Sequence, residues 1–138
     1  MRFGTSSTMR SLVRDLDRLI ATQIAIGTSA FDLDAVMATV VDEARELTHA
    51  DAAVIELPDG DDMVYRAASG KAWPHTGIRV PRATSISGLA VATGEVLVSA
   101  DTRLDPRVNR EICEKVGARS LVVNSRQYVV QHAIHVVE

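Results

Sequence analysis

The sequence predicts one domain of the α+β class. At 138 residues the chain has the length of a single domain and can bury one core. Apolar residues recur at helical spacing over residues 32–48, and residues 52–57 and 63–69 have the composition of two strands joined by a turn. Short helical segments then alternate with apolar segments as far as residue 123. This order of elements predicts helices packed on a sheet.

The composition limits both the core and the partners. Hydrophobic residues make up 46% of the chain but aromatic residues only 4%, so the core must consist mainly of Val, Ala, Leu and Ile. We expect its few large side chains to be Trp73, Tyr65, Phe31 and Phe3. The net charge is −3 and the basic residues are interspersed with acidic ones, which argues against binding to nucleic acid or to an anionic membrane.

The location of the protein is constrained by what the sequence lacks. No apolar run approaches the roughly 20 residues of a membrane span, and the first residues do not form the apolar region of a signal peptide. The single cysteine excludes an internal disulfide, which agrees with a cytoplasmic protein.

Residues 1–28 are expected to form an N-terminal amphipathic helix that precedes the main domain. Apolar residues recur at alternating spacings of three and four over residues 9–26, and only Gln23 interrupts them. Two interpretations remain open. The helix lies on its own domain, or it pairs with a second copy in a short coiled coil and makes the protein a homodimer, with Gln23 setting the register. The apolar line consists of Met9, Leu12, Leu16, Leu19 and Ile26.

The main domain, residues 29–138, begins with a helix capped by Asp32 or Asp34 and ending near Thr48. The apolar strand 52–57 follows, then a turn at residues 58–61 and the second strand of a hairpin. Residues 70–77 have no period and predict a loop, after which residues 78–80 form a short strand.

Two short helices are predicted in the second half of the chain. Ser87 is expected to cap the first, which ends at Gly94, and a strand covers residues 95–99. Asp105 and Pro106 are expected to start the second helix, which ends at Gly117 before a strand at residues 119–123. The second helix is predicted to bury Val108, Ile112 and Val116, and to pair Arg110 with Glu114 and Glu111 with Lys115 on its solvent face.

Four stretches together resemble the GAF family of small-molecule sensor domains. They are DLDAV from residue 32, SGLAVATGE from residue 87, DTRLDPRV from residue 101 and VGARSLVV from residue 116. The resemblance covers residues 31–123 and implies a GAF/PAS-like fold, with an antiparallel central sheet of five to six strands and helices packed on it. It also implies a ligand between the sheet and the helices and loops of residues 85–117.

The tail, residues 124–138, departs from this family. Related domains normally continue with Pro-Leu, a glycine turn, a last core strand and an exit helix, whereas here a short polar segment precedes the apolar residues 128–137. We expect residues 124–126 to turn the chain back, so that 128–137 pairs beside 119–123 and replaces the final strand of the family. Because both faces of this strand are apolar, we also expect it to contribute to self-association.

No catalytic or metal-binding constellation is predicted. Cys113 lies beside the apolar stripe of its helix and is expected to be a buried small hydrophobe. Family members that attach a bilin carry their cysteine about where Val108 stands, and those that reduce free methionine sulfoxide need two cysteines. His132 and His135 lie three apart in a strand and so point to opposite faces, which does not suit a shared metal. Ser85 and Ser87 have no His or Asp in a motif relation.

A ligand pocket is the remaining functional hypothesis. Trp73 and His75 lie in the loop expected to cover the cavity, and Thr102, Arg107 and Arg110 surround the turn and helix start, where amide hydrogens and guanidinium groups favour an anion. The alternative is that Trp73 belongs to the core and the arginines to the surface.

The sequence therefore predicts a non-enzymatic sensor that binds a small molecule and signals through the arrangement of a dimer. It points to no particular cofactor. The alternative is a degenerate module that only dimerises or binds another protein. A cavity of roughly 300 Å³ or more with convergent polar groups would favour the sensor, and a cavity filled by Val and Leu would favour the scaffold.

Overall fold

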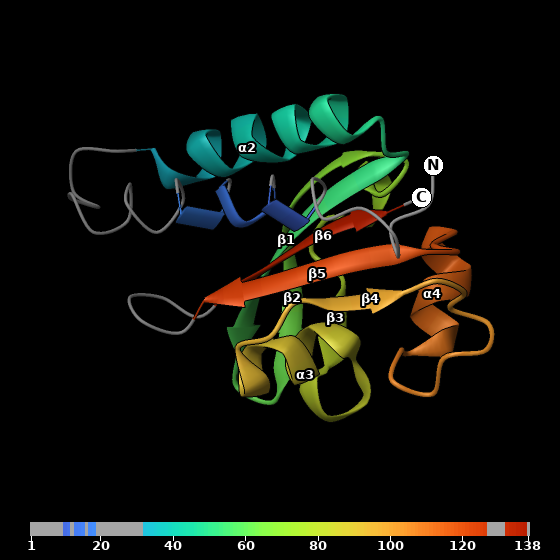
Figure 1. Ribbon diagram of the computed structural model, residues 1–138. Coiled ribbons are helices and arrows are strands. Elements are labelled where there is room, and N and C mark those ends of the chain that lie inside the picture. The colour runs from blue at the N-terminus through green and yellow to red at the C-terminus, as the bar shows by residue number, and fades with distance from the viewer. Residues whose placement is uncertain (1–9, 12, 16, 19–31, 127–131, 138) are drawn as a thin grey trace.

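The computed structural model describes residues 10–11, 13–15, 17–18, 32–126 and 132–137. Its centre is an antiparallel sheet with the strand order β3-β2-β1-β6-β5-β4. Helix α2 lies on one face of the sheet, and α3 and α4 lie on the other (Figure 1). The predicted α+β class, with helices packed on an antiparallel sheet, is confirmed. The strands are β1 (Ala52–Asp59), β2 (Asp62–Gly70), β3 (Arg79–Pro81), β4 (Leu97–Ser99), β5 (Leu121–Arg126) and β6 (His132–Val137).

Helix α2 (Leu33–Thr48) begins and ends at residues with capping geometry. Of the two predicted caps, Asp32 is the one used, because its carboxylate accepts a hydrogen bond of 3.2 Å from the amide of Ala35. His49 ends the helix in the left-handed conformation, with a φ of 56°. Ser69 of β2 is hydrogen-bonded to Asp42 and Arg45 of α2. The rest of the buried side of α2 packs against β1 and β2 through an apolar cluster, namely Met37, Val40, Val41, Ala44, Ala53, Ile55 and Ala67.

The predicted hairpin is β1–β2. Its turn is tighter than expected, because Asp59 already pairs with Asp62 and only Gly60 and Asp61 connect the strands. The register between the strands shifts at Ile55 and Glu56, which marks a β-bulge. The predicted loop after the hairpin contains the 3-10 turn η2 (Trp73–His75), and a second one, η3 (Arg82–Thr84), follows β3.

Both predicted caps of the later helices are wrong. Helix α3 (Ile86–Thr93) is capped by Ser85, whose hydroxyl accepts a hydrogen bond of 3.0 Å from the amide of Gly88. Ser87 therefore lies inside the helix and its hydroxyl is available for another contact. The expected stop at Gly94 is confirmed by its left-handed conformation.

Helix α4 (Arg110–Val116) starts later than predicted, with Asn109 as its cap. The carboxylate of Asp105 instead accepts hydrogen bonds from the backbone amide and the guanidinium of Arg107, which stabilises a separate turn before the helix. Gly117 ends the helix as expected, and Arg110 pairs with Glu114 at 3.4 Å. No Glu111–Lys115 ion pair forms among the residues that the structure describes.

The C-terminal strand completes the sheet, as the sequence predicts. Strand β6 lies between β1 and β5 and pairs antiparallel with both. The predicted turn at residues 124–126 is wrong, because β5 continues through Arg126 and all three residues pair with β6. A polar sequence is compatible with a strand here because the backbone is paired and Ser125 donates its side-chain hydrogen bond to the carbonyl of Ala90. The reversal of the chain falls outside the described residues.

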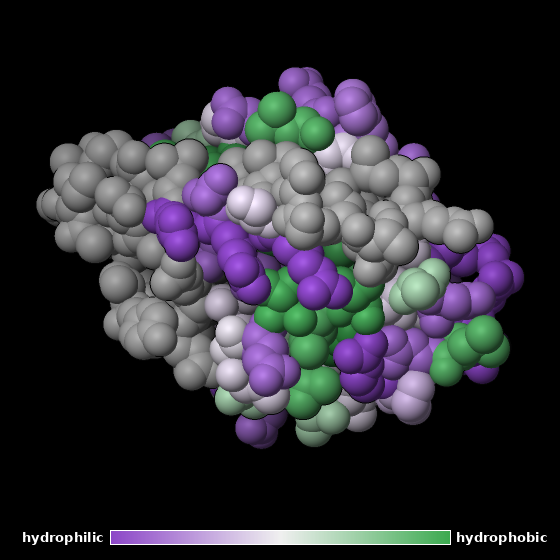
Figure 2. Space-filling view, viewed as in Figure 1, coloured by the Kyte–Doolittle hydropathy of each residue, from purple (hydrophilic) through white to green (hydrophobic). Residues whose placement is uncertain are grey.

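Most of the predicted N-terminal helix also lies outside the described residues. Residues 10–11, 13–15 and 17–18 are helical. Val13 is fully buried and packs with Ala50 and Val122, beside the partly buried Val96 and Val98. Figure 2 shows a hydrophobic area over β4, flanked by hydrophilic side chains. The described part of the N-terminal segment therefore lies on its own domain. None of the helices among the described residues is long and apolar enough to cross a membrane.

Candidate ligand-binding site

A small cavity lies between the sheet and the pair of helices α3 and α4. We call it the buried cavity because most of its lining residues are buried, although it also has an opening to solvent. Its volume is about 30 Å³, which is enough for a water molecule and far below the volume of a typical ligand pocket. Its walls come from β1, β2, β3, β5, α3 and α4, and it lies where the resemblance places a ligand. The lining residues are Glu56, Tyr65, Val80, Ser85, Ile86, Ser87, Val108, Asn109, Ile112, Cys113, Ala118 and Leu121.

Glu56 is the most unusual member of this lining. The alternation along β1 directs Ile55 to α2 and Glu56 to the buried cavity, where its exposed fraction is only 1%. The hydroxyl of Ser87 donates a hydrogen bond of 3.1 Å to the carboxyl group and lies 3.3 Å from the hydroxyl oxygen of Ser85. Burial raises the pKa of Glu56 to about 8, although the bond from Ser87 acts in the opposite direction. The carboxyl group is therefore mostly protonated at neutral pH.

Two further lining groups are also protonated at neutral pH. Burial raises the pKa of the Tyr65 hydroxyl well above its ordinary value, and the negative charges of Glu56 and Cys113 add to this effect. Burial, together with the charges of Glu56 and Asp105, raises the pKa of the Cys113 thiol to about 11. The lining of the cavity thus contains a carboxyl, a phenol and a thiol group that are protonated at neutral pH.

A larger hollow lies on the outer side of α4. We call it the α4 cleft. It has a volume of about 310 Å³ and opens to solvent. Cys113 and Ala118 line both the α4 cleft and the buried cavity, so these two residues form the wall between them. The cleft is lined by Thr102, Arg103, Arg110, Cys113, Glu114, Gly117, Ala118 and Arg119.

The structure brings together only two of the five predicted ligand-binding residues. Thr102 and Arg110 line the α4 cleft. Arg107 lines neither hollow, because its guanidinium binds the carboxylate of Asp105 at 2.7 Å and the carbonyl of Val98 at 2.7 Å. Trp73 and His75 lie in η2 and also line neither hollow. The expectation that Trp73 is a large core residue is wrong as well, since 68% of its surface is exposed.

The sequence contained a signal for the residue that this prediction missed. Five of the six residues of the segment 52–57 are apolar, and Glu56 is the exception. An ionised carboxylate in the middle of a buried strand lowers the stability of the fold unless it is paired or protonated. Its position in this strand therefore indicates a functional group. Cys113, predicted to be a buried small hydrophobe, packs against the core cluster but is only partly buried.

A family model for the GAF domain matches residues 32–125, which is more than half of the chain. The chain belongs to the GAF domain family. GAF domains are a family of regulatory and sensor domains, and the buried cavity of this one lies between the sheet and helices α3 and α4. No protein with a curated description matches the sequence.

Solved GAF structures share the fold at low sequence identity. The GAF domain of a phosphoenolpyruvate-protein phosphotransferase from Coxiella burnetii is 18% identical, with a TM-score of 0.68, over 96% of this chain and 80% of that one. The free methionine-R-sulfoxide reductase of Neisseria meningitidis, solved with its substrate, is 20% identical, with a TM-score of 0.68, over 97% of this chain and 77% of that one. The A. aeolicus nlh2 GAF domain is 12% identical, with a TM-score of 0.66, over 94% and 81%. One of these neighbours is an enzyme, and together they show the fold.

The described residues contain no group of three or more His, Cys, Asp or Glu side chains that could hold a metal ion. His132 and His135 both lie on β6 in the described backbone.

Proposed function

We propose that this GAF domain is a regulatory sensor that binds a small molecule in the buried cavity between the sheet and helices α3 and α4. The observation that supports the proposal is the carboxyl group of Glu56, which faces this cavity from the middle of β1. Burial of a carboxyl group opposes folding, so its place in the core is better explained by ligand recognition than by stability. Ser85, Ser87 and Tyr65 supply further polar groups around it.

Binding must enlarge the cavity. A volume of about 30 Å³ does not hold a metabolite, so part of the wall has to move when the ligand enters. The wall on the side of α4 is suited to this, because residues 100–109 form turns and bends without a helix or strand. Cys113 and Ala118 line both the buried cavity and the α4 cleft. A shift of α4 would join the two hollows and carry the signal outward.

The chemistry available to this site is recognition rather than catalysis. Reduction of free methionine sulfoxide, the activity for which the Neisseria neighbour is named, requires a nucleophilic and a resolving cysteine, and this chain has one cysteine. Burial also raises the pKa of the Cys113 thiol to about 11, which leaves little thiolate at neutral pH. We therefore place this domain with the non-enzymatic members of the family.

Signalling is proposed to pass through a homodimer that uses the N-terminal helix. Val13 and Asp17, on one side of the described helical residues, are buried against the domain. In the sequence, Leu12 and Leu16 of the apolar line that begins at Met9 each precede one of these two residues by one position. Successive residues of a helix point in different directions, so we propose that the apolar line forms a second side that contacts a partner. Sedimentation of the protein with and without residues 1–28 tests this, and we expect a dimer that becomes a monomer on truncation. A monomer in both cases would rule out the coiled-coil seam.

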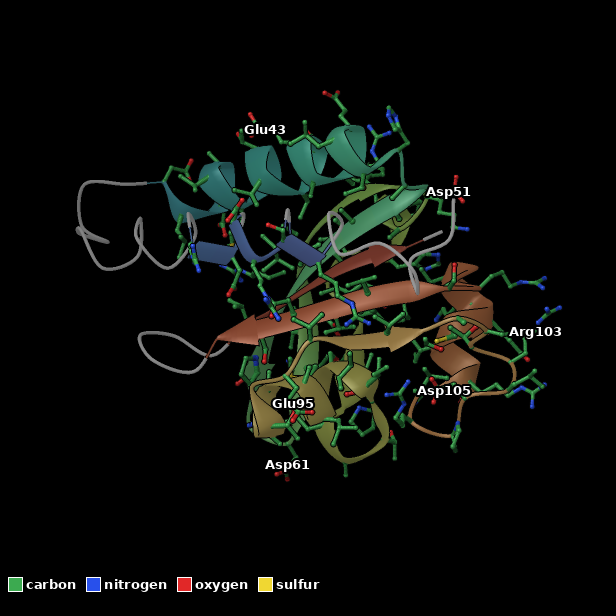
Figure 3. The ribbon with its side chains drawn as sticks, in the orientation of Figure 1. Glu43, Asp51, Asp61, Glu95, Arg103 and Asp105 are labelled. Carbon is green, nitrogen blue, oxygen red and sulfur yellow. The ribbon has the colours of Figure 1, made fainter. Side chains whose placement is uncertain are left out.

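The binding proposal is tested by native mass spectrometry of the protein purified from its own host. We expect a retained small molecule that is absent when Glu56→Gln is purified in the same way. Glu43→Gln is the matched control, since it makes the same chemical change on the solvent face of α2 (Figure 3). A bound molecule that is retained equally by all three proteins would show that Glu56 does not recognise it.

A scaffold without a ligand is the second candidate, and the small volume of the buried cavity favours it. Val80, Ile86, Val108, Ile112 and Leu121 already fill most of the space between the sheet and the helices. In that case the protein carries no molecule from its host, and Glu56→Gln changes stability without changing any bound mass.

A further inference from the structure

The α4 cleft has the size of a small-molecule site and lies outside the cavity assigned to the sensor function. Its volume of about 310 Å³ falls within the range of roughly 300–1,000 Å³ found for ligand pockets. It opens to solvent, so a ligand can enter it without displacing α4.

Positive charge gathers around this cleft although the chain as a whole is acidic. The chain carries a net charge of −3, yet three arginines line the cleft, against one acidic residue in its lining, Glu114, and one beside it, Asp101, which is bound to Arg103. The arginines come from three separate places in the fold. Arg103 lies in the segment after β4, Arg110 is the first residue of α4, and Arg119 precedes β5. Such a concentration of one sign in a hollow attracts ligands of the opposite sign.

The guanidinium groups remain available to a ligand. Arg110 and Glu114 are 3.4 Å apart and both side chains are 66% exposed, so their ion pair contributes little and is easily exchanged. Among the described residues the guanidinium of Arg119 forms no direct ion pair. The hydrogen bonds from Arg103 lower the pKa of the Asp101 carboxyl group, and the charge of Arg119 adds to this effect only at longer range. Arg103 is held by Asp101 at 3.0 Å, and Figure 3 shows it pointing outward beside α4.

The floor of the cleft is fixed by hydrogen bonds of the buried residue Thr102. Its hydroxyl donates to the carbonyl of Ala118 at 2.6 Å, and its amide donates to the carbonyl of Arg119 at 2.9 Å. These two bonds tie the segment after β4 to the segment before β5. The backbone segments that carry Arg103 and Arg119 are therefore held next to each other, which reduces the entropy lost when a ligand binds.

We propose that the α4 cleft binds a small molecule carrying a dianionic group, of which a phosphate monoester is the simplest example, with Arg110 and Arg119 as its main ligands. Guanidinium groups bind phosphate and carboxylate oxygens with two parallel hydrogen bonds, and two of them match the charge of one dianion. The cleft excludes a nucleic-acid chain, because its positive charge is confined to this single hollow on an acidic protein.

Cys113 provides a direct test. It lines the cleft and is the only cysteine in the chain, so no other thiol of the protein can react. The rate of its alkylation by iodoacetamide, a neutral reagent, therefore reports whether a ligand occupies the α4 cleft. At constant ionic strength, glycerol 3-phosphate is expected to slow the alkylation in a saturable manner, and glycerol is expected to have no effect. Malonate, a dianion that carries two carboxylates and no phosphate, is tested beside glycerol 3-phosphate to distinguish a carboxylate ligand from a phosphate ligand. Protection by both compounds supports a general dianion site, and protection by glycerol 3-phosphate alone supports a phosphate site.

Variants show whether the arginines are responsible. Arg119→Ala and Arg110→Ala are each expected to weaken protection by about tenfold, the loss of one charge-assisted contact. Arg66→Ala is the control, because Arg66 of β2 is also exposed, is ion-paired to Asp34 of α2 and does not line the cleft. Amide chemical shifts of Thr102 and Gly117 give a second readout that does not depend on thiol reactivity. Equal protection by sodium chloride, or unchanged protection and shifts in Arg119→Ala, would overturn the proposal.

Discussion

The two faces of the central sheet differ in the kind of side chain that they bury. The face under α2 is packed mainly by apolar residues, and its buried hydroxyl, that of Ser69, is hydrogen-bonded to Asp42 and Arg45 of α2. The face under α3 and α4 buries a larger apolar cluster together with the carboxyl group of Glu56 and the hydroxyls of Ser85, Ser87 and Ser125, and it borders both hollows. Two adjacent residues of β1 represent the contrast, since Ile55 faces α2 and Glu56 faces the buried cavity.

This difference indicates a division of roles within one sheet. Close apolar packing stabilises a fold, whereas buried polar groups beside unfilled space oppose folding and are found where a ligand is recognised. The α2 face therefore serves mainly stability, and the α3 and α4 face gives up part of its stability for binding. The predictions that follow test this comparison.

The largest effect is expected from deletion of residues 127–138. Strand β6 lies between β1 and β5, so its removal separates the two halves of the sheet and uncovers both faces at once. We expect an insoluble or unfolded protein, measured by solubility, size-exclusion chromatography and circular dichroism. Deletion of Glu138 alone is the control and is expected to leave the fold unchanged. A soluble, folded product of the larger deletion would show that neither face depends on β6.

The helix ends, the hairpin and strand β5 show how much of the fold a local sequence pattern can predict. The cap at Asp32, the hairpin and the glycine stops at Gly94 and Gly117 depend on neighbouring residues, and all were predictable. The cap at Asn109 was not, because Asp105 offers an equally good signal and is diverted by its contact with Arg107. The length of β5 was missed because Asn124–Arg126 is polar, and it is a strand only through pairing with a segment later in the chain.

The candidate site was less predictable than the fold. Whether an arginine faces a hollow or a neighbouring carboxylate depends on the position of residues distant in sequence. Arg110 faces the α4 cleft, whereas Arg107, three residues earlier, binds Asp105. Arg103 and Arg119 carried no signal in the sequence, since they meet only when Thr102 ties their segments together.

The second largest effect is expected on the α2 face. Ile55 is fully buried among Met37, Val41 and other apolar side chains, so Ile55→Ala leaves a cavity that close packing cannot fill. We expect the free energy of unfolding to fall by about 2–5 kcal/mol, measured by urea denaturation. Ile55→Val serves as the conservative control, with a loss of about 1 kcal/mol. A loss for Ile55→Ala no larger than that for Ile55→Val would contradict the tight packing of this face.

Next in size is the effect of pH through Glu56. Its pKa is raised from 4.5 in the unfolded chain to about 8 in the folded protein. Between these two values the folded protein holds a proton that the unfolded chain has released, so rising pH favours unfolding. Stability should therefore decrease as the pH rises through this window, by up to about 1.4 kcal/mol per pH unit.

Urea denaturation at several pH values, compared between the wild type and Glu56→Gln, measures this dependence. The amide of glutamine cannot ionise, so we expect a flatter curve for the variant and greater stability than the wild type near pH 8. Glu43→Gln, on the solvent face of α2, should reproduce the wild-type curve. Parallel curves for Glu56→Gln and the wild type would show that Glu56 does not carry the dependence.

The smallest effect is expected at Trp73, which lies in η2 and belongs to the buried cluster of neither face. Because 68% of its surface is exposed, Trp73→Ala should change the free energy of unfolding by no more than about 0.5 kcal/mol. Trp73 is also the only tryptophan, so its fluorescence reports this one position. We expect emission typical of an indole in water and efficient quenching by acrylamide. Blue-shifted emission that resists quenching would show that the indole of Trp73 is buried. If Trp73→Ala also lost much stability, η2 would have to be counted as part of the face under α3 and α4.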